Sequence, residues 1–237
     1  MSRFCEQQRF VTFTRTFLAA VLTGTLAAGG AVPALAGGSA EQQQLVDKAK
    51  MTLEGLLADS STGPALRALR QETKAIYIVP QFVRGAFVFG GAGGSGVLLV
   101  RDDATKKWSE PAFYNIGSAS FGLQAGGDVS EMIIVVVTQK GLEQFYRSEF
   151  KLGLDAGMAV GPVGEGGGVK GITADLVGYA KKKGAFVGMS VDGSIITVSD
   201  DSNAAYYGQA VRPTDIIVKH VVSNPKSADL RNAAAKF

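Results

Sequence analysis

The chain has 237 residues, of which 24 are basic and 21 acidic, and it contains 31 glycines, one histidine and one cysteine. This near balance of charge excludes the overall basic excess that drives nonspecific nucleic-acid binding, so an anionic partner must meet a local patch. A single cysteine also excludes an internal disulfide.

The first 36 residues have the pattern of an export signal. Three arginines precede an apolar stretch at 17–28, and Ala34-Leu35-Ala36 supplies small residues at positions −3 and −1 of a cleavage site. We expect cleavage after Ala36, which leaves residues 37–237 as one exported domain, periplasmic or secreted. An uncleaved anchor is the alternative, but the apolar run is interrupted by polar residues and is shorter than the roughly 20 residues of a bilayer span.

Cleavage changes the composition in two ways. It removes Cys5, and with it any thiol nucleophile or thiolate metal site; Gly37 at the cleavage point also excludes a lipid-modified cysteine there. It removes three arginines and one glutamate, which leaves 21 basic and 20 acidic residues in a nearly neutral protein. Residues 37–237 are enough for a single domain with a core of its own.

Two helices are predicted at the start of this domain. Apolar residues recur at helical spacing from 41 to 59, with polar residues on the opposite side, as in an amphipathic helix. Pro64 suits the first turn of a second, short helix at 65–73. Because the first helix has only Lys48 and Lys50 as cations and no Trp or Phe, packing on a core is favoured over insertion into a membrane interface.

After Lys74, short apolar runs between Gly, Asp, Asn and Pro predict strands. The candidate strands are 75–79, 85–89, 96–101, 118–126, 131–138, 151–160, 174–179, 185–191 and 194–199. Segments 118–126 and 151–160 alternate apolar and polar residues, so each is expected to bury one face. The run 132–137 does not alternate and is expected to form a central strand covered on both faces.

The remaining local signals lie in the C-terminal half. Asp192-Gly193 between two strand segments predicts a hairpin with a type I′ turn. Segments 141–150 and 200–209 are expected to be helical, and 214–218 forms an apolar C-terminal segment. Together these elements predict an α+β fold, with N-terminal helices packed on a glycine-rich, mainly antiparallel curved sheet or partial barrel.

The glycine-rich stretch at 87–100 raises the question of a nucleotide site. Gly91, Gly93 and Gly96 have the spacing of a dinucleotide-binding fingerprint, and Glu110 lies nearly as far downstream as that motif's acidic residue. The fingerprint needs a helix after the glycines, because the helix N-terminus holds the pyrophosphate. Residues 97–100 instead predict a strand. We therefore expect no nucleotide, and glycines where strands bend, bulge or pass closely over a packed helix.

Catalytic and metal-binding patterns are weak. His220 is the sole histidine, and no G-x-S-x-G elbow accompanies it. The aspartates lie in predicted turns without the spacing of an oxygen-ligand loop, so we expect no metal, no cofactor and no enzymatic activity. The aromatic residues follow strand or helix periodicity, which favours a core over a nucleic-acid platform. Five carboxylates are interpreted as solvated surface groups: Glu110, Glu131, Glu143, Glu149 and Glu165.

Four motifs occur in a fixed order along the chain. They are W-S-x-P at 108–111, S-F-G-L-Q-x-G-G at 120–127, G-P-V-G at 161–164 and Y-x-x-x-K-G-x-F-x-G at 179–188. In these motifs the chain resembles the SYLF domain family, also called DUF500, from about residue 45 to 220. The resemblance implies a non-enzymatic binder of membrane lipids; eukaryotic members bind phosphoinositides and some bind actin.

The chain departs from the eukaryotic members in its predicted export signal and in having no SH3 or FYVE module beside the domain. It therefore resembles the stand-alone exported bacterial members. For such a protein the resemblance implies anionic bacterial phospholipids, rather than phosphoinositides or actin, as the ligand.

One basic cluster is singled out as a lipid-binding site. Lys181, Lys182 and Lys183 precede Gly184 at the expected start of a hairpin, where three cations can meet phosphate head groups together. Arg84, Lys106 and Lys107 extend this patch if their turns lie at the same end of the sheet. The alternative function is an envelope protein-interaction or structural module with incidental lipid affinity, and a hydrolase dependent on His220 ranks below both.

Overall fold

The computed structural model describes residues 34–86, 89–121, 126–161, 173–182, 185–186 and 191–237. The chain separates into a segment 1–31, outside the described part, and a unit 32–237, to which the following refers. The predicted export signal therefore lies outside the described residues, apart from 34–36 at the start of the first helix. Within the described residues no helix is both long and apolar enough to cross a bilayer.

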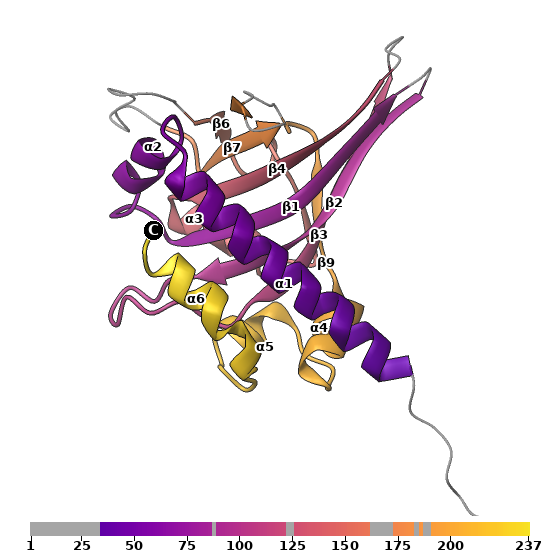
Figure 1. The fold of residues 1–237 in the computed structure, drawn as a ribbon, viewed down its shortest axis with the longest axis vertical. Helices are drawn as coiled ribbons and strands as arrows, with labels where there is room; N and C mark the ends of the chain where they lie inside the picture. Colours follow the sequence, from indigo (N-terminus) through magenta and orange to yellow (C-terminus); the bar gives the residue numbers. More distant parts are fainter. Residues whose placement is uncertain (1–33, 87–88, 122–125, 162–172, 183–184, 187–190) are drawn as a thin grey trace, which may run out of the picture. The chain divides into compact units, whose positions relative to one another are not determined.

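The described strands form one curled sheet with the order β5-β9-β3-β2-β1-β4-β7-β6, and β8 pairs with β7 (Figure 1). All pairs are antiparallel except β6 with β7. The α+β fold with a mainly antiparallel curved sheet is thereby confirmed. The strands are β1 (Ala75–Ala86), β2 (Phe89–Val100), β3 (Ala112–Phe121), β4 (Gly126–Val136), β5 (Glu149–Lys151), β6 (Met158–Val160), β7 (Leu176–Lys182), β8 (Ala185–Phe186) and β9 (Ile195–Val198).

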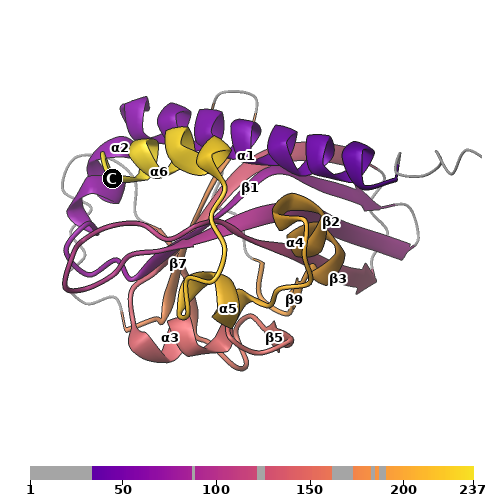
Figure 2. The same cartoon turned by 90° about the horizontal axis from the view of Figure 1, so that it is seen from below.

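Helices cover both faces of the sheet. Figure 2 shows α1 and α6 on one face, with α3 and α5 on the other. The helices are α1 (Ala34–Ala58), α2 (Gly63–Ala68), α3 (Gln139–Gln144), α4 (Asp200–Tyr207), α5 (Pro213–Ile217), the 3-10 turn η1 (Pro225–Ser227) and α6 (Ala228–Ala234). The α1 side chains Val46, Ala49, Leu53 and Leu56 are buried, so this helix packs on the core as its sequence favours.

Strand β4 separates two hydrophobic cores. Ile133 and Val135 belong to the core under α1, whereas Ile134 and Val136 belong to the core on the opposite face. Residues 132–136 are all buried, which confirms the expected central strand. Burial of each such aliphatic side chain is worth about 1.5–3 kcal/mol, so this strand contributes to the stability of both layers at once.

The glycine-rich stretch lies inside β2, which runs without a break from Phe89 to Val100, and no helix follows it. The expectation of two strands joined by glycines was therefore wrong, and the pyrophosphate-binding geometry is not formed there. Strand β1 bulges between Ile78 and Val83. A Cβ atom at Gly94 or Gly96 would overlap the backbone of this bulge, so these glycines permit a close approach of strands.

Two alternating segments were wrongly predicted as single strands. In 151–160, Gly153 has φ +81° and turns the chain, so β5 and β6 pair with different strands and Leu154 is 77% exposed. In 118–126, β3 ends at Phe121 and Gly126 begins β4, while Ala119 is exposed. Alternation thus found apolar residues correctly but could not show where the chain reverses.

Several element boundaries also differ from expectation. The predicted helix at 65–73 is α2, which begins at Gly63 and ends at Ala68, and α3 ends at Gln144 because β5 begins soon afterwards. The segment 214–218 falls almost entirely in the helix α5. The Asp192-Gly193 turn forms, with Ser194 N donating to Val191 O, but only Gly193 has a positive φ, so it is not type I′. Strand β9 then pairs with β3 and β5.

Candidate functional site

The lysines singled out on β7 are engaged in ion pairs. Lys181 Nζ lies 3.1 Å from the carboxylate of Asp59, and Lys182 Nζ lies 2.8 Å from that of Asp128. Lys183 lies outside the described residues. Because Lys181 is only 19% exposed and both cations already face a carboxylate, they contribute little free positive charge at the surface.

Asp59 has a structural role at the end of α1. Its carboxylate accepts hydrogen bonds from the backbone N–H groups of Ser61 and Thr62, at 2.9 and 3.0 Å. These bonds, that of Thr62 first, together with the Lys181 ammonium, lower the pKa of Asp59 to about 2. Lys181 therefore ties β7 to the turn between α1 and α2.

The other predicted lipid-binding residues lie at two separate places. Arg84 is exposed on β1 and lies opposite Asp128 of β4. It is nine residues along β1 from Ala75, which pairs with Val100 at the other end of the strand. Lys106 and Lys107 follow that other end of β2. At about 3.3 Å per residue, roughly 30 Å of sheet separates the two places, so the structure does not bring the five described residues of the predicted site into one patch.

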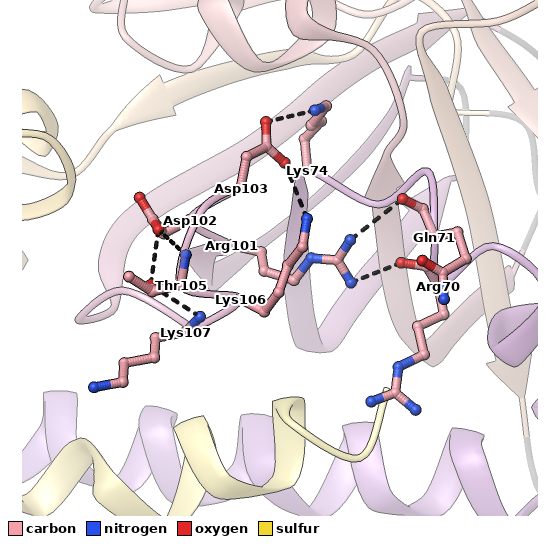
Figure 3. A network of polar contacts seen from close by, with 9 residues as sticks. All are labelled: Arg70, Gln71, Lys74, Arg101, Asp102, Asp103, Thr105, Lys106 and Lys107. Carbon is pink, nitrogen blue, oxygen red and sulfur yellow. Dashed lines mark hydrogen bonds and ion pairs between the residues drawn. The ribbon is translucent and has the colours of Figure 1, made fainter.

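The turn between β2 and β3, residues 101–108, is called the basic loop below (Figure 3). Asp102 Oδ1 accepts hydrogen bonds from Thr105 N and Oγ1 at 2.6 and 2.7 Å, and these N–H and O–H groups lower the pKa of Asp102. Lys106 adopts φ 58°, a left-handed conformation that is uncommon outside glycine. The loop is thus held in a defined shape by its own acidic residue.

Arg101 and Lys74 fasten the basic loop to the rest of the domain. The Arg101 guanidinium donates to the carbonyl oxygens of Arg70 and Gln71, at 2.7 and 3.3 Å. Asp103 accepts from Lys74 at 2.6 Å, and this ammonium lowers the pKa of Asp103. Figure 3 shows Asp102 bonded to Thr105 within the loop, Asp103 facing Lys74 and Lys106, and the Lys107 side chain pointing away from both carboxylates.

The loop therefore presents cations without matching carboxylates. Lys106 Nζ reaches Asp103 only at 4.0 Å and is 62% exposed. The side chains of Lys107 and Arg70 form no ion pair with any described residue. In this part of the molecule the positive charge of the chain faces solvent.

Three hollows surround Trp108, the only tryptophan of the chain. The first, about 220 Å³, is lined by residues that include Arg70, Arg101 and Lys106, and the second, about 320 Å³, by residues that include Lys107 and Arg231. None of the described residues lining these two hollows is acidic. The third, called the large hollow below, measures about 680 Å³.

Glu110 secures the C-terminal segment beside the basic loop. It is 7% exposed and accepts hydrogen bonds from Ser227 Oγ at 2.7 Å and Ser223 Oγ at 3.1 Å, with Arg231 at 3.3 Å. The Trp108 and Phe237 rings meet edge to face with centroids 6.4 Å apart. The prediction that Glu110 is a solvated surface group was wrong, and its place inside the W-S-x-P motif was the available signal.

His220 lies on the rim of the large hollow, exposed and with φ 52°. Asp102 and Glu110 line the same hollow, but both are held by the contacts described above. Across the described ranges no group of three or more His, Cys, Asp or Glu side chains is placed to hold a metal ion. The arrangement presents cations and aromatic surface suited to holding an anion, rather than an assembled nucleophile and base.

Comparison with known proteins identifies the family of the chain. The model of the Ysc84 family, described as Las17-binding protein actin regulator, matches residues 117–237, just over half of the chain. The chain belongs to the Ysc84 (SYLF) family. Its relatives are described as binding or regulatory proteins rather than enzymes.

Three relatives show the extent of the similarity. SH3 domain-containing YSC84-like protein 1 of Rattus norvegicus is 31% identical over 160 residues, 65% of this chain and 46% of that protein. An SH3 domain-containing protein of Schizosaccharomyces pombe is 30% identical over 163 residues, 64% and 36%. LAS seventeen-binding protein 3 of Saccharomyces cerevisiae is 32% identical over 139 residues, 53% and 28%. The chain thus spans less than half the length of these relatives.

Two of the family motifs meet in the structure. Gly161, the first residue of G-P-V-G, donates its N–H to Gly178 O at 2.8 Å, and a Cβ atom at this position would overlap the ring of Tyr179. Tyr179 begins the Y-x-x-x-K-G-x-F-x-G motif and is buried, which raises its pKa to about 12. This pair of motif residues serves close packing beside β7.

Proposed function

We propose that this Ysc84-family domain binds anionic phospholipid head groups at a membrane surface, without catalysis, through the basic loop. One observation carries the proposal. Two hollows beside Trp108 are lined by cations, and none of their described lining residues is acidic. We further propose that the protein is exported and meets the lipid in the periplasm or outside the cell.

The expected energetics are those of a surface contact. Each Lys or Arg near an anionic membrane contributes about 1 kcal/mol, and salt screens this attraction within a Debye length. Lys106 and Lys107 lie next to each other on an exposed turn, so both can approach a planar surface together. Lys181 and Lys182 have their carboxylate partners already, and the proposal assigns them no part in binding.

A protein partner is the second candidate. The matching family is described as Las17-binding and actin-regulating, and one relative is a LAS seventeen-binding protein, so protein binding has a direct precedent among relatives. For an exported chain the partner would be an envelope protein. The cationic hollows would then receive acidic side chains in place of phosphates.

The test is co-sedimentation with vesicles of neutral and of anionic phospholipid, at low and at physiological salt. The test variant is Lys106→Ala/Lys107→Ala, and the matched control is Arg147→Ala/Lys151→Ala. The control removes the same charge from exposed residues that form no ion pair with any described residue. We expect anionic vesicles alone to bind. At low salt, binding should be about thirtyfold weaker with the test variant, at about 1 kcal/mol per lysine, and within twofold of the unmodified protein with the control.

The other outcomes are equally informative. Equal losses in both variants would show attraction to net charge without a site at the basic loop. Absence of binding to every vesicle would contradict lipid recognition and leave the envelope partner as the better candidate.

A further inference from the structure

We propose that the large hollow holds the apolar part of a single anionic amphiphile, whose acidic head lies against Lys107 and His220. This inference rests on the proposed function and goes further, because it assigns one lipid-like molecule to a defined cavity instead of a general contact with a membrane surface. At about 680 Å³ the hollow has the size of sites that bind small molecules.

One wall of the large hollow is apolar. Leu142 and Tyr146 come from α3 and the turn after it, and Ile217, Val218 and Val222 come from the end of α5 and the segment that follows. Trp108 contributes the aromatic surface on the side of the basic loop. These elements belong to different parts of the sequence, so the tertiary fold assembles the wall.

The rim of the large hollow is polar and carries charges of both signs. Three lining cations match its three carboxylates, and Lys74 beside Asp103 adds one further cation. Three carboxylates line the hollow, but each has partners of its own: Asp102 holds Thr105, Asp103 faces Lys74, and Glu110 faces Arg231. Lys107 and His220 form no ion pair with any described residue. An anionic group is therefore favoured at this rim over a neutral or cationic one.

Backbone conformation points to the same place. Lys106 and His220 are the two non-glycine residues with positive φ in the described part of the chain. His220 lines the large hollow, and Lys106 lines the neighbouring hollow beside Trp108. Such a conformation costs roughly 1–2 kcal/mol per residue, and residues held in it gather at ligand sites. At position 220, just after a helix, glycine would avoid this cost.

The chain offers a matched pair of residues for the test. Val218 and Val221 are both 56% exposed, but only Val218 lines the large hollow. A charge introduced at either position remains in contact with solvent, so Val218→Asp and Val221→Asp are expected to fold alike. Equal urea midpoints would verify this.

The readout is the fluorescence of Trp108, the sole tryptophan, in the full-length protein. Three probes are titrated below their micelle concentrations: octyl phosphate, which has both head and chain; glycerol 3-phosphate, which has only the head; and octyl glucoside, which has the chain and a neutral head. We expect a saturable change with octyl phosphate and at least tenfold weaker binding of each of the other two probes.

The two variants then show where the octyl chain of the probe binds. Val218→Asp should weaken octyl phosphate at least fivefold because it places a carboxylate on the apolar wall, whereas Val221→Asp should stay within twofold of the unmodified protein. Equal affinities of octyl phosphate and glycerol 3-phosphate, or equal effects of the two variants, would overturn the inference. Equal affinities of octyl phosphate and octyl glucoside would also overturn it, because the head would then contribute nothing.

Failure here and failure of the proposed function are distinguishable. If octyl phosphate shows no saturable binding while anionic vesicles bind and lose affinity with Lys106→Ala/Lys107→Ala, the inference about the hollow is wrong and surface recognition stands. If octyl phosphate binds as expected but vesicles do not, the site takes a free amphiphile and the membrane-surface function is wrong.

Discussion

The lysines of β7 and those of the basic loop are the same residue type in two regions with different electrostatic surroundings. Lys181 and Lys182 extend from a strand beside the core and meet Asp59 and Asp128, at 3.1 and 2.8 Å. Lys106 and Lys107 extend from an exposed turn, where Asp103 lies 2.6 Å from Lys74 and only 4.0 Å from Lys106. The difference teaches that a run of lysines in a sequence does not reveal how much free positive charge it contributes, because the fold decides which of the cations meet carboxylates at close range.

The largest expected effect comes from removing the carboxylate that joins the basic loop to the C-terminal segment. Glu110→Ala leaves the Ser223 and Ser227 hydroxyls and the Arg231 guanidinium without their acceptor, next to a cavity. We expect a loss of about 3 kcal/mol in the free energy of unfolding, measured by urea denaturation. Glu143→Ala, at an exposed position, serves as the control and should change stability by less than about 0.5 kcal/mol.

The next-largest effect tests the β7 region through the pH dependence of the free energy of unfolding. The pKa of Asp59 is about 2 in the folded protein and higher when unfolded, so its contribution is present above about pH 4 and is lost as the pH falls toward 2. Asp59→Asn should therefore cost about 1–2 kcal/mol at pH 7 and almost nothing near pH 2. Urea denaturation at a series of pH values measures this; a difference independent of pH would contradict the role assigned to the charge.

Alanine variants of the two lysine pairs test the two regions against each other. Lys181→Ala/Lys182→Ala should lower stability by about 1 kcal/mol, because Asp59 and Asp128 lose their partners, and should leave binding to anionic vesicles within twofold. Lys106→Ala/Lys107→Ala should leave stability almost unchanged and reduce vesicle binding. Thermal unfolding and co-sedimentation of both variants provide the measurements, and the comparison fails if the β7 variant loses as much binding as the loop variant.

The smallest effect concerns backbone strain. His220→Gly relieves the positive φ but gives the unfolded chain more freedom, so we expect a net stabilisation below about 1 kcal/mol. Urea denaturation of the variant and of the unmodified protein measures this change, and a clear loss of stability would contradict relief of backbone strain at position 220.

Local pattern was sufficient for much of the fold. The helical spacing of Leu53 and Leu56 placed α1 on the core, and the unbroken apolar run at 132–137 identified the central strand between two layers, of which residues 132–136 are buried. The local sequence pattern failed where the chain reverses direction. Gly153 turns the backbone inside a segment whose alternation continues past it, because alternation records side-chain polarity and carries no record of a φ angle.

The candidate site was only partly predictable. Lys106 and Lys107 were recognised as cations, but Arg70, Arg231 and Trp108 were missed as their companions, since they come from distant segments of the sequence. Glu110 was predicted to be solvated because its place in the W-S-x-P motif does not identify the residues that bind it. Its partners lie more than a hundred residues away, on the C-terminal segment.

By itself the sequence determined the α+β class, the apolar segments that form the cores, the family motifs and the near balance of charge. These properties depend on composition and on the spacing of neighbouring residues. Only the tertiary structure decided which lysines are paired, how β2 glycines fit the bulge of β1, and which hollows surround Trp108. The physical reason is that ion pairing, close approach of backbones and cavity shape depend on distances between segments far apart in the chain, which no local pattern records.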